Sequence, residues 1–435
     1  MTAADRKSDS PSALDSACFL LLCIIFIFAV VAYGAVDPIS TSILAVLTLL
    51  LVLIWTANAF RKGKFSISND RLQIPIVILI AIALFQLLPL GITGDPDQVL
   101  SIPASQALTM DPFATRMFAV RLVLLLVFLA AALTFVNSGK RVKSLVMVLI
   151  AFGMIAGFFG IIQKLADPGA IYGLRPTPQA IPFGSYVNQH HFASLMVMLL
   201  GPALGLVFTR GVRKDLFPLL IIAVIIMATA AFFTGSRGGI ISLLSTLTLI
   251  LIYSRGSFDA EDSAPNVFWR RGAGILALGL VLIGAIIGLA VLLGGGESVL
   301  RGIGLSTDTE DVTSGRLHYW SVALKIFAEH PILGAGFDAF SVAFPQLDTR
   351  NGLFRIEQAH NEYLQILAEG GLIGILPFVI FLWFLFVRAR KAIGSASSRA
   401  DIGIRVGSTA GCFGVLVHSI FDFPLRTHFF HGGME

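Results

Sequence analysis

Charged residues and cysteines are both scarce in this sequence. Only 13% of the 435 residues are charged, whereas 56% are hydrophobic. A soluble domain of this length needs far more charge to cover its surface. The three cysteines, Cys18, Cys23 and Cys412, all lie in apolar runs, so the sequence offers neither a disulfide framework nor a cysteine-based metal site. A net charge of +5 on such a chain is no footprint of nucleic-acid binding, and we expect no nucleic-acid partner.

Apolar runs near the roughly 20 residues that span a bilayer recur from one end of the chain to the other. They predict membrane helices near residues 17–36, 39–60, 74–90, 116–137, 144–164, 187–209, 216–234, 238–254, 272–294, 363–387 and 403–421. The chain is therefore predicted to be an all-α polytopic membrane protein with about eleven transmembrane helices in a lipid bilayer. The first apolar run lacks a small-residue cleavage site, which favours an uncleaved signal anchor.

Lysine and arginine residues alternate between two sets of connections. The basic set comprises residues 61–71, 140–143, 210–214, 255–271 and 388–399. Short basic loops stay in the cytoplasm, so residues 1–16 are predicted to be a cytoplasmic tail. The segments 91–115, 165–186, 234–238 and 295–362 and the tail 422–435 are then periplasmic, with nine helices in 17–294 and the last two in 363–421. The periplasmic side holds few basic residues, among them Arg175 and Arg237.

The segment 295–362 is the one long periplasmic loop. Within it, residues 315–329 read as an amphipathic helix that Ser314 or Thr313 can cap. Its apolar stripe suits a helix lying in the membrane interface and consists of Leu317, Trp320, Leu324 and Phe327. The phenylalanines that follow could contact sugars, but plain packing is the commoner role of such residues; they are Phe337, Phe340, Phe344 and Phe354.

Several polar residues lie where predicted helices begin on the periplasmic side. Helix N-termini present unpaired N–H groups and a positive dipole end, and both favour anions. The residues at these ends are Arg116, Arg121, Asn188, His190, His191, Arg237, His360 and Asn361. If these helices are neighbours, the sequence predicts a site for a strongly anionic group at the periplasmic membrane surface.

Each candidate also has a plainer interpretation. Ser236 can cap the helix at 238–254 and Arg237 suits a phosphate, but a tight turn with one snorkelling arginine is the alternative. Arg121 lies inside a predicted helix, where a charge needs a partner, a task or a nearby interface. Arg175 could contact phosphate or be solvated.

The histidines do not form an obvious metal site. His360 ends the long loop at the mouth of a helix, where a neutral ring could accept a proton; from the residues alone, a capping or structural role is favoured. His190 and His191 point in diverging directions on a helix, which disfavours chelation by both. Clustered carboxylates at 308–311 could bind a metal, although a mobile acidic loop is the commoner meaning of such a run.

The same residues form a pattern that resembles the O-antigen ligase and Wzy-type polymerase superfamily. Its most specific part is His360-Asn361 followed, after nine residues, by Gly371-Leu372-Ile373-Gly374. The stretches at 187–193, 234–239, 315–336 and 418–425 are also similar to that family, in the same order along the chain. Together these segments cover roughly residues 187–426.

The resemblance implies a metal-independent membrane glycosyltransferase of the C-type class, without a cofactor, in the bacterial inner membrane. It would take a glycan from an undecaprenyl diphosphate donor and pass it to a hydroxyl on lipid A core, another glycan or a protein. By motif position, Arg237 and Arg316 would bind the diphosphate, and His360 would take the acceptor proton, giving inversion at the anomeric carbon. Further substrate-binding candidates are Arg121, Arg175, Asn188, His191 and Asn361.

Two departures from the family pattern affect these expectations. The loop pattern of the polymerases, an arginine, ten residues and a glycine, is not cleanly present, which favours ligation over polymerisation. Relatives usually have twelve helices, so a truncated C-terminal end is expected here. A flippase or transporter is the main alternative from another class, although it would place polar groups near the bilayer midplane. A catalytically silent structural subunit is a further alternative.

Overall fold

The computed structural model describes residues 12–90, 106–166, 170–177, 181–256, 315–350 and 356–427, together with positions 284 and 288. Its helices are α1 (Ala13–Val31), α2 (Pro38–Lys62), α3 (Gln73–Gln86), α4 (Pro112–Phe135), α5 (Gly139–Ala166), α6 (Gln189–Thr209), α7 (Phe217–Phe233), α8 (Arg237–Gly256), α11 (Arg316–Glu329), α12 (Phe340–Leu347), α13 (Glu362–Gly394), α14 (Arg399–His418) and α15 (Pro424–Thr427). The 3₁₀ turn η1 (Tyr33–Ala35) and the antiparallel strands β1 (Ala170–Ile171) and β2 (Arg175–Pro176) complete the described elements. The predicted helix at 272–294, apart from positions 284 and 288, and the acidic run at 308–311 lie outside the described residues.

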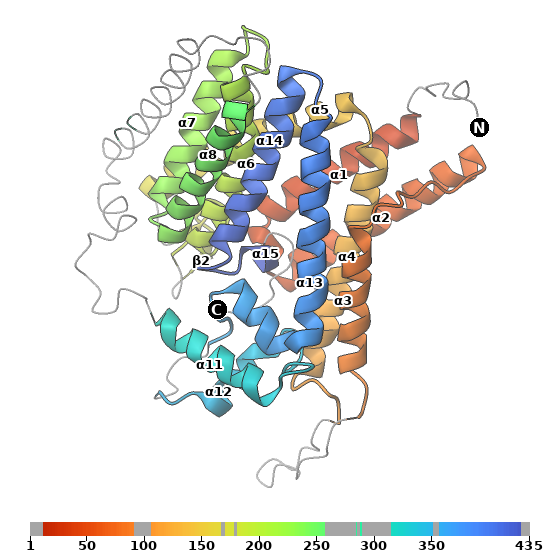
Figure 1. Cartoon of the computed structure of the whole chain (residues 1–435), viewed down its shortest axis with the longest axis vertical. Helices are drawn as coiled ribbons and strands as arrows, with labels where there is room; N and C mark the ends of the chain where they lie inside the picture. The colour runs from red at the N-terminus through yellow and green to blue at the C-terminus, as the bar shows by residue number, and fades with distance from the viewer. Residues whose placement is uncertain are drawn as a thin grey trace.

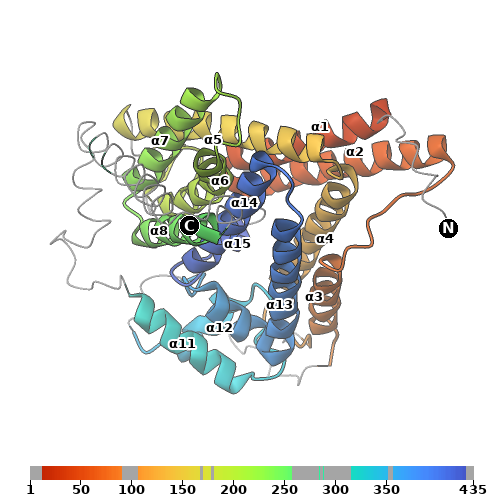
Figure 2. The same ribbon diagram turned by 45° about the horizontal axis from the view of Figure 1, so that its top comes forward.

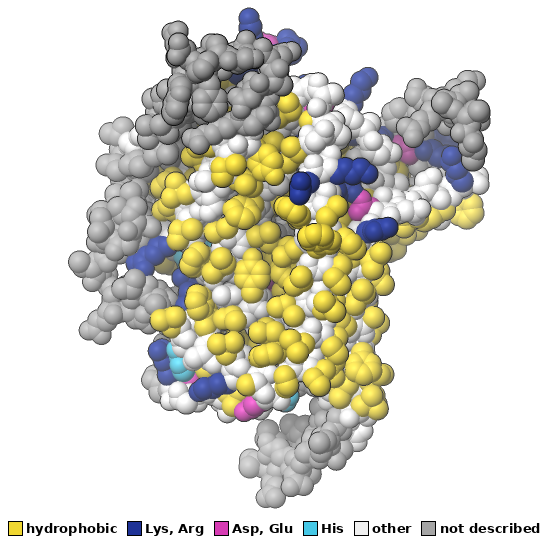
Figure 3. All heavy atoms as spheres, in the orientation of Figure 1, with side chains coloured by type: hydrophobic (Ala, Val, Ile, Leu, Met, Phe, Trp, Pro, Cys, Tyr) yellow, Lys and Arg dark blue, Asp and Glu magenta, His cyan; other side chains and the backbone are white. Residues whose placement is uncertain are grey.

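Most of the long helices could cross a membrane. Within the described residues, seven are long and apolar enough to do so: α1, α2, α4, α5, α6, α13 and α14. The shorter apolar helices α3, α7 and α8 pack beside them. Figure 3 shows a broad hydrophobic surface across the middle of the molecule, with Lys and Arg side chains at its upper and lower edges. These features confirm the predicted all-α polytopic membrane fold.

The first helix differs from its predicted range. It begins at Ala13 and not near residue 17, because Ser12 and Asp15 form a capping box in which each side chain accepts a hydrogen bond from the other's backbone N–H. It ends at Val31, and Gly34, with φ of 74°, separates it from α2. The last four residues of the predicted tail 1–16 therefore belong to this helix.

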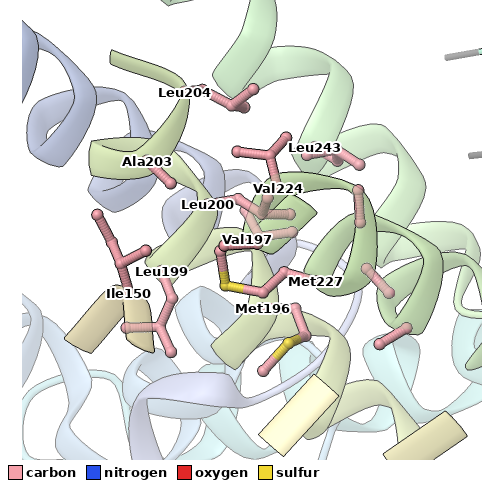
Figure 4. Packing of buried hydrophobic residues seen from close by; sticks show 14 of the residues in the cluster. Ile150, Met196, Val197, Leu199, Leu200, Ala203, Leu204, Val224, Met227 and Leu243 are labelled. Carbon is pink, nitrogen blue, oxygen red and sulfur yellow. The ribbon is translucent and has the colours of Figure 1, made fainter. Parts of the chain in front are cut away.

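Helix α6 forms the centre of the largest core. Of its apolar stretch, 94% is buried inside the protein. Met196, Leu199 and Leu200 of α6 pack against Met227 of α7 and Ile150 of α5 (Figure 4). Burial on nearly every face explains why α6 is apolar all round and shows no amphipathic pattern.

Helices α6 and α14 run antiparallel in direct backbone contact along a glycine seam. The seam consists of Gly201, Gly205, Gly403, Gly407 and Gly411. A Cβ atom added to Gly205 would collide with the carbonyl oxygen of Gly403, and one added to Gly201 would collide with that of Gly407. Small residues permit such close approach of membrane helices. The contact brings the N-terminal end of α6 beside the C-terminal end of α14.

A second group of helices contains α3, α4 and α13, with α11 and α12 at one end (Figures 1 and 2). The buried Gln86 side chain joins this group, because its Nε2 donates to the carbonyls of Leu333 (2.7 Å) and Glu369 (3.0 Å). Its Oε1 accepts from the backbone N–H of Phe337 at 3.0 Å. Helix α13 kinks at Gly371, where φ is 59°. These contacts fix the long loop against the start of α13.

The amphipathic helix of the long loop is confirmed as α11, but its predicted cap is wrong. Gly315 occupies the N-cap with φ of 78° and makes no side-chain hydrogen bond to the helix. The buried face consists of Val322, Ala323 and Ile326. Leu317 and Leu324 of the predicted apolar stripe are exposed, as suits a helix that lies on a membrane surface.

The phenylalanines of this region pack as expected. Phe337, Phe340 and Phe344 are each at most 2% exposed. Phe340 and Phe344 pack against the buried face of α11, whereas Phe337 stacks on Phe118 of α4. Their burial leaves the sugar-contact alternative without support at these three positions.

Candidate functional site

A buried carboxylate joins two histidines at the end of the bundle beside α11. Asp422, in the turn after α14, has a side chain that is 1% exposed. Its Oδ1 lies 3.1 Å from Nδ1 of His360 and 3.8 Å from Nε2 of His191. The first distance is a hydrogen bond, and the second is an electrostatic contact beyond hydrogen-bond range. Three separate parts of the chain therefore meet at one carboxylate.

The backbone at His360 is held in an unusual conformation. Its φ is 50°, in the left-handed region that non-glycine residues seldom adopt. The next residue, Asn361, caps α13 by accepting from the N–H groups of Tyr363 and Leu364, both at 3.1 Å. The N–H of Glu362 donates to the carbonyl of Ser419 near the end of α14. The surrounding structure thus fixes a strained position, as is common at functional sites.

Aromatic rings fix the direction of the histidine side chains. Phe423 packs edge-on against His191 and His360, with ring centroids 4.7 Å and 5.2 Å apart. The ring of Tyr319 of α11 lies 6.1 Å from that of His360, tilted by 31°. The His360 side chain is nevertheless 26% exposed, so part of it is open to the surroundings of the protein.

Burial alone would raise the pKa of Asp422. The neighbouring His191 and His360 side chains reverse that effect and hold its pKa well below the ordinary aspartate value. Asp422 is therefore ionised at neutral pH. Within the described part of the chain, Oδ2 of Asp422 and Nε2 of His191 are buried without a hydrogen-bond partner. Unsatisfied polar atoms of this kind suit a site that takes a polar ligand or water.

A second histidine contact lies next to the first. Nδ1 of His190 is 2.9 Å from Oγ of Ser236, and Ser236 caps α8 by accepting from the N–H of Gly239 at 3.1 Å. Asn188 caps α6 by accepting from the N–H of His190. The predicted capping by Ser236 is confirmed. The ends of α6 and α8 therefore face the same cluster.

The start of α8 also packs on the end of α14. A Cβ atom on Gly238 would lie 3.3 Å from the ring of His418 and 3.1 Å from Phe421, so only a residue without a side chain fits without a shift. This close contact places the next turn of α8 against the segment that leads to Asp422.

Two arginines begin the helices that border the cluster. Arg237 is the first residue of α8 and follows Ser236 directly; Arg316 is the first residue of α11. Both are half-buried. Arg316 lies within electrostatic range of the His190 ring. The helix N-termini and these guanidinium groups together make this end of the bundle favourable for an anion.

The other predicted arginines have partners elsewhere. Arg121 of α4 is 9% exposed, and its Nη1 lies 2.8 Å from Oδ2 of Asp338. Arg175 of β2 lies 2.6 Å from Asp37 and 4.9 Å from the centroid of the Tyr33 ring. The structure thus gives these two arginines ion pairs of their own. Their predicted roles in substrate binding remain predictions.

The structure brings together most of the predicted site and adds residues that the sequence interpretation missed. His191 and His360 meet at Asp422, and the two predicted asparagines cap the helices that carry these histidines. Asp422 itself was missed, although it follows the last apolar run directly and lies in a stretch with a family-like pattern. Tyr319 was missed because it lies on a helix predicted only to rest on the membrane.

Apolar helices of membrane-spanning length, with a polar His–Asp cluster at their ends, define an integral multi-pass membrane protein with a single-sided candidate site. Two comparisons with known proteins identify similar sequences. A family model described as O-antigen ligase matches residues 222–379. An O-antigen ligase of Pseudomonas aeruginosa is 24% identical over 295 residues, or 67% of this chain. Both matches support the resemblance to the O-antigen ligase and Wzy-type superfamily that the sequence pattern predicted.

The comparisons cover the site unevenly. The family match includes Arg237, Arg316 and His360 but ends before Asp422 and begins after His191. This chain spans 63% of the length of the Pseudomonas relative.

Proposed function

We propose that this protein transfers a glycan from an undecaprenyl diphosphate carrier to an acceptor hydroxyl at the periplasmic face of the bacterial inner membrane. The observation that carries the proposal is the contact between His360 and the buried Asp422. The carboxylate accepts the Nδ1–H of His360, so that Nε2 has a free lone pair. A partly exposed imidazole held in this tautomer is a suitable general base.

The reaction follows from these groups. Nε2 of His360 takes the proton of the acceptor hydroxyl as its oxygen attacks the anomeric carbon. The bond from that carbon to the diphosphate oxygen breaks, and the carrier diphosphate leaves with the electron pair. Arg237 and Arg316 stabilise the negative charge that grows on the diphosphate. Attack opposite the leaving group inverts the anomeric carbon. We assign Asp422 a positioning role, because it acts on His360 and not on the substrate.

The remaining predicted residues have supporting roles in this proposal. Asn188 and Asn361 hold the helix ends that carry the histidines, and His191 helps to fix Asp422. The donor and acceptor are carbohydrate-bearing lipids or glycans, or a protein hydroxyl. Ligation to lipid A core is favoured over polymerisation, since the family model and the Pseudomonas relative are both described as O-antigen ligases.

The periplasmic assignment rests on the distribution of basic residues. The ends of α2, α5 and α13 that hold Lys and Arg clusters lie away from the His360 cluster (Figure 1). Short basic connections remain cytoplasmic, which supports a cytoplasmic N-terminus and a site on the opposite side. A site at helix ends also fits a transferase better than a transporter, which would bind near the bilayer midplane.

The test is a transfer assay with the full chain in proteoliposomes, with undecaprenyl-diphosphate glycan, candidate acceptors and EDTA. Wild type is compared with His360→Ala and Arg237→Ala, and with His330→Ala as a control outside the cluster. We expect product from wild type and His330→Ala and at least a hundredfold loss in the other two. Equal activity in all four proteins would contradict the site, and activity abolished by EDTA would contradict metal independence. Movement of donor lipid across the bilayer without transfer would favour a flippase.

A further inference from the structure

A polar cavity lies away from the His360 cluster, at the basic ends of the first helices. It has a volume of about 700 Å³ and is bordered by α1, α2, α4 and α5. The ends that meet there are the N-terminal ends of α1 and α5 and the C-terminal ends of α2 and α4. Its charged lining consists of Asp15, Lys62, Lys64 and Arg141. Three cations and one anion leave a surplus of positive charge.

One of the cations is already neutralised within the protein. Nζ of Lys62 lies 2.8 Å from both carboxylate oxygens of Asp15. Nδ2 of Asn58 donates to the same carboxylate at 2.8 Å. This three-residue contact ties α1 to α2 and forms one wall of the cavity. Because Asp15 neutralises the charge of Lys62, Lys62 contributes little to the binding of an anionic ligand.

The other two cations have no carboxylate partner among the residues that the structure describes. Lys64 is exposed just beyond the end of α2. Arg141 is held in place because its Nη1 donates to the carbonyl of Phe135 at 2.8 Å and its guanidinium lies 5.8 Å from the Phe19 ring. Its Nη2 is buried and lacks a hydrogen-bond partner in the described chain. A guanidinium held in place with an unused N–H group is suited to bind an anion.

The N-terminus of α5 adds to the positive potential. Ser138 lies just before this helix, and its Oγ accepts the N–H of Arg141 at 3.3 Å. The positive end of the helix dipole is therefore next to the cavity. Asn137 and Thr134 supply further polar groups in the lining, while Trp55 adds an apolar wall. Phosphate oxygens suit the polar part, and an acyl or glycerol moiety suits the apolar part.

We propose that this cavity binds a phosphate group, and that its source is the headgroup of an anionic phospholipid. Basic pockets between membrane helices on the cytoplasmic side are suited to such headgroups, because the anionic leaflet lies at the same level. Lys64 and Arg141 contact the phosphate, whereas Lys62 with Asp15 holds the wall. The site is separate from the glycan-transfer cluster, and it shares with the function proposed above only the cytoplasmic placement of these helix ends.

The test is native mass spectrometry of the full chain released from detergent, titrated with phosphatidylglycerol, with phosphatidylcholine and with inorganic phosphate. Variants are Lys64→Gln, Arg141→Gln and both together. Lys143→Gln is the matched control, because Lys143 is exposed on the same turn of α5 but does not line the cavity. We expect each cavity variant to weaken phosphatidylglycerol binding about fivefold and the control less than twofold.

The outcomes separate the sources of the phosphate group. Preference for phosphatidylglycerol that is lost in the cavity variants supports the lipid headgroup. Binding of inorganic phosphate that is equally sensitive to the variants, without lipid binding, supports the phosphate site but overturns the lipid source. Lys64→Gln changes an exposed side chain and should fold normally. Phosphatidylglycerol binding that is unchanged in both Lys64→Gln and Arg141→Gln would overturn the proposal.

Discussion

The contact between Asp422 and His360 gives the sharpest prediction. Asp422→Asn keeps the size of the side chain but removes its charge. The amide can turn its NH₂ group toward Nδ1 of His360, which then becomes the acceptor. In that tautomer Nε2 carries the proton and cannot take one from the acceptor hydroxyl. We expect kcat for glycan transfer to fall about 10²–10⁴-fold, the usual contribution of a correctly held general base.

The same change should also affect stability. Asp422 is almost fully buried, and its hydrogen bond with His360 is charge-assisted, a type worth about 1.5–3 kcal/mol. The pKa of Asp422 is lower in the folded protein, so the charged form stabilises the fold above the ordinary aspartate pKa. That contribution is lost as the pH falls through the lowered pKa. The difference in Tm between wild type and Asp422→Asn should not begin to narrow until the pH is below about 4.

The assay compares kcat, KM and Tm for reconstituted wild type, Asp422→Asn and Asp348→Asn. Asp348 is a matched control because its Oδ1 lies 2.6 Å from Nε2 of another histidine, His318, outside the cluster. We expect Asp348→Asn to change kcat less than threefold. A merely structural Asp422 would lower Tm without a selective loss of kcat. Normal kcat in Asp422→Asn would refute the positioning role.

Three further changes test the packing and the arginines. Gly205→Ala should lower the free energy of unfolding by about 1–3 kcal/mol, because the new Cβ collides with backbone of α14; Gly394→Ala, with nothing within 4 Å, is the control in thermal unfolding. Arg121→Met should lower the free energy of unfolding by about 3–5 kcal/mol, because it removes the buried cation that pairs with Asp338. A raised KM with a normal Tm would instead indicate that Arg121 binds substrate. Arg175→Ala should cost less than about 1 kcal/mol, since both partners of its ion pair are about 30% exposed; a large loss of transfer activity would show that it binds donor.

Local features of the fold were predictable because they depend on neighbouring residues. Apolar runs gave the approximate positions of the described membrane helices. The side chains of Asn188, Ser236 and Asn361 cap helices at positions where such residues are favoured. The main errors lie at helix ends, as at α1, where the capping box of Ser12 and Asp15 extends the helix into a segment predicted to be a tail.

The assembly of the site was less predictable, since it depends on contacts between distant parts of the chain. His360 and Asp422 are 62 residues apart, and Arg121 and Asp338 are 217 apart. The spacing of apolar and polar residues predicts helices, but it does not show which distant residues contact one another. The convergence of the ends of α4, α6, α8 and α13 was inferred from charge and helix direction. The ends of α6, α8 and α13 meet at the cluster, whereas Arg121 of α4 pairs with Asp338. The role of Asp422, whose carboxylate joins His191 and His360, could be identified only from the three-dimensional structure.

The glycine seam between α6 and α14 has a consequence for how the protein responds to its membrane. It begins roughly 15 Å along α6 from His191 at 1.5 Å per residue, and it joins the helix that carries this histidine to the helix that leads to Asp422. The two helix backbones are in direct contact there, with no flexible side chains between them. A change in the length of the lipid acyl chains therefore cannot alter the distance between the two helices by compressing such side chains. The two helices should tilt as one body, and bilayer thickness should leave the spacing of the histidines and the carboxylate unchanged.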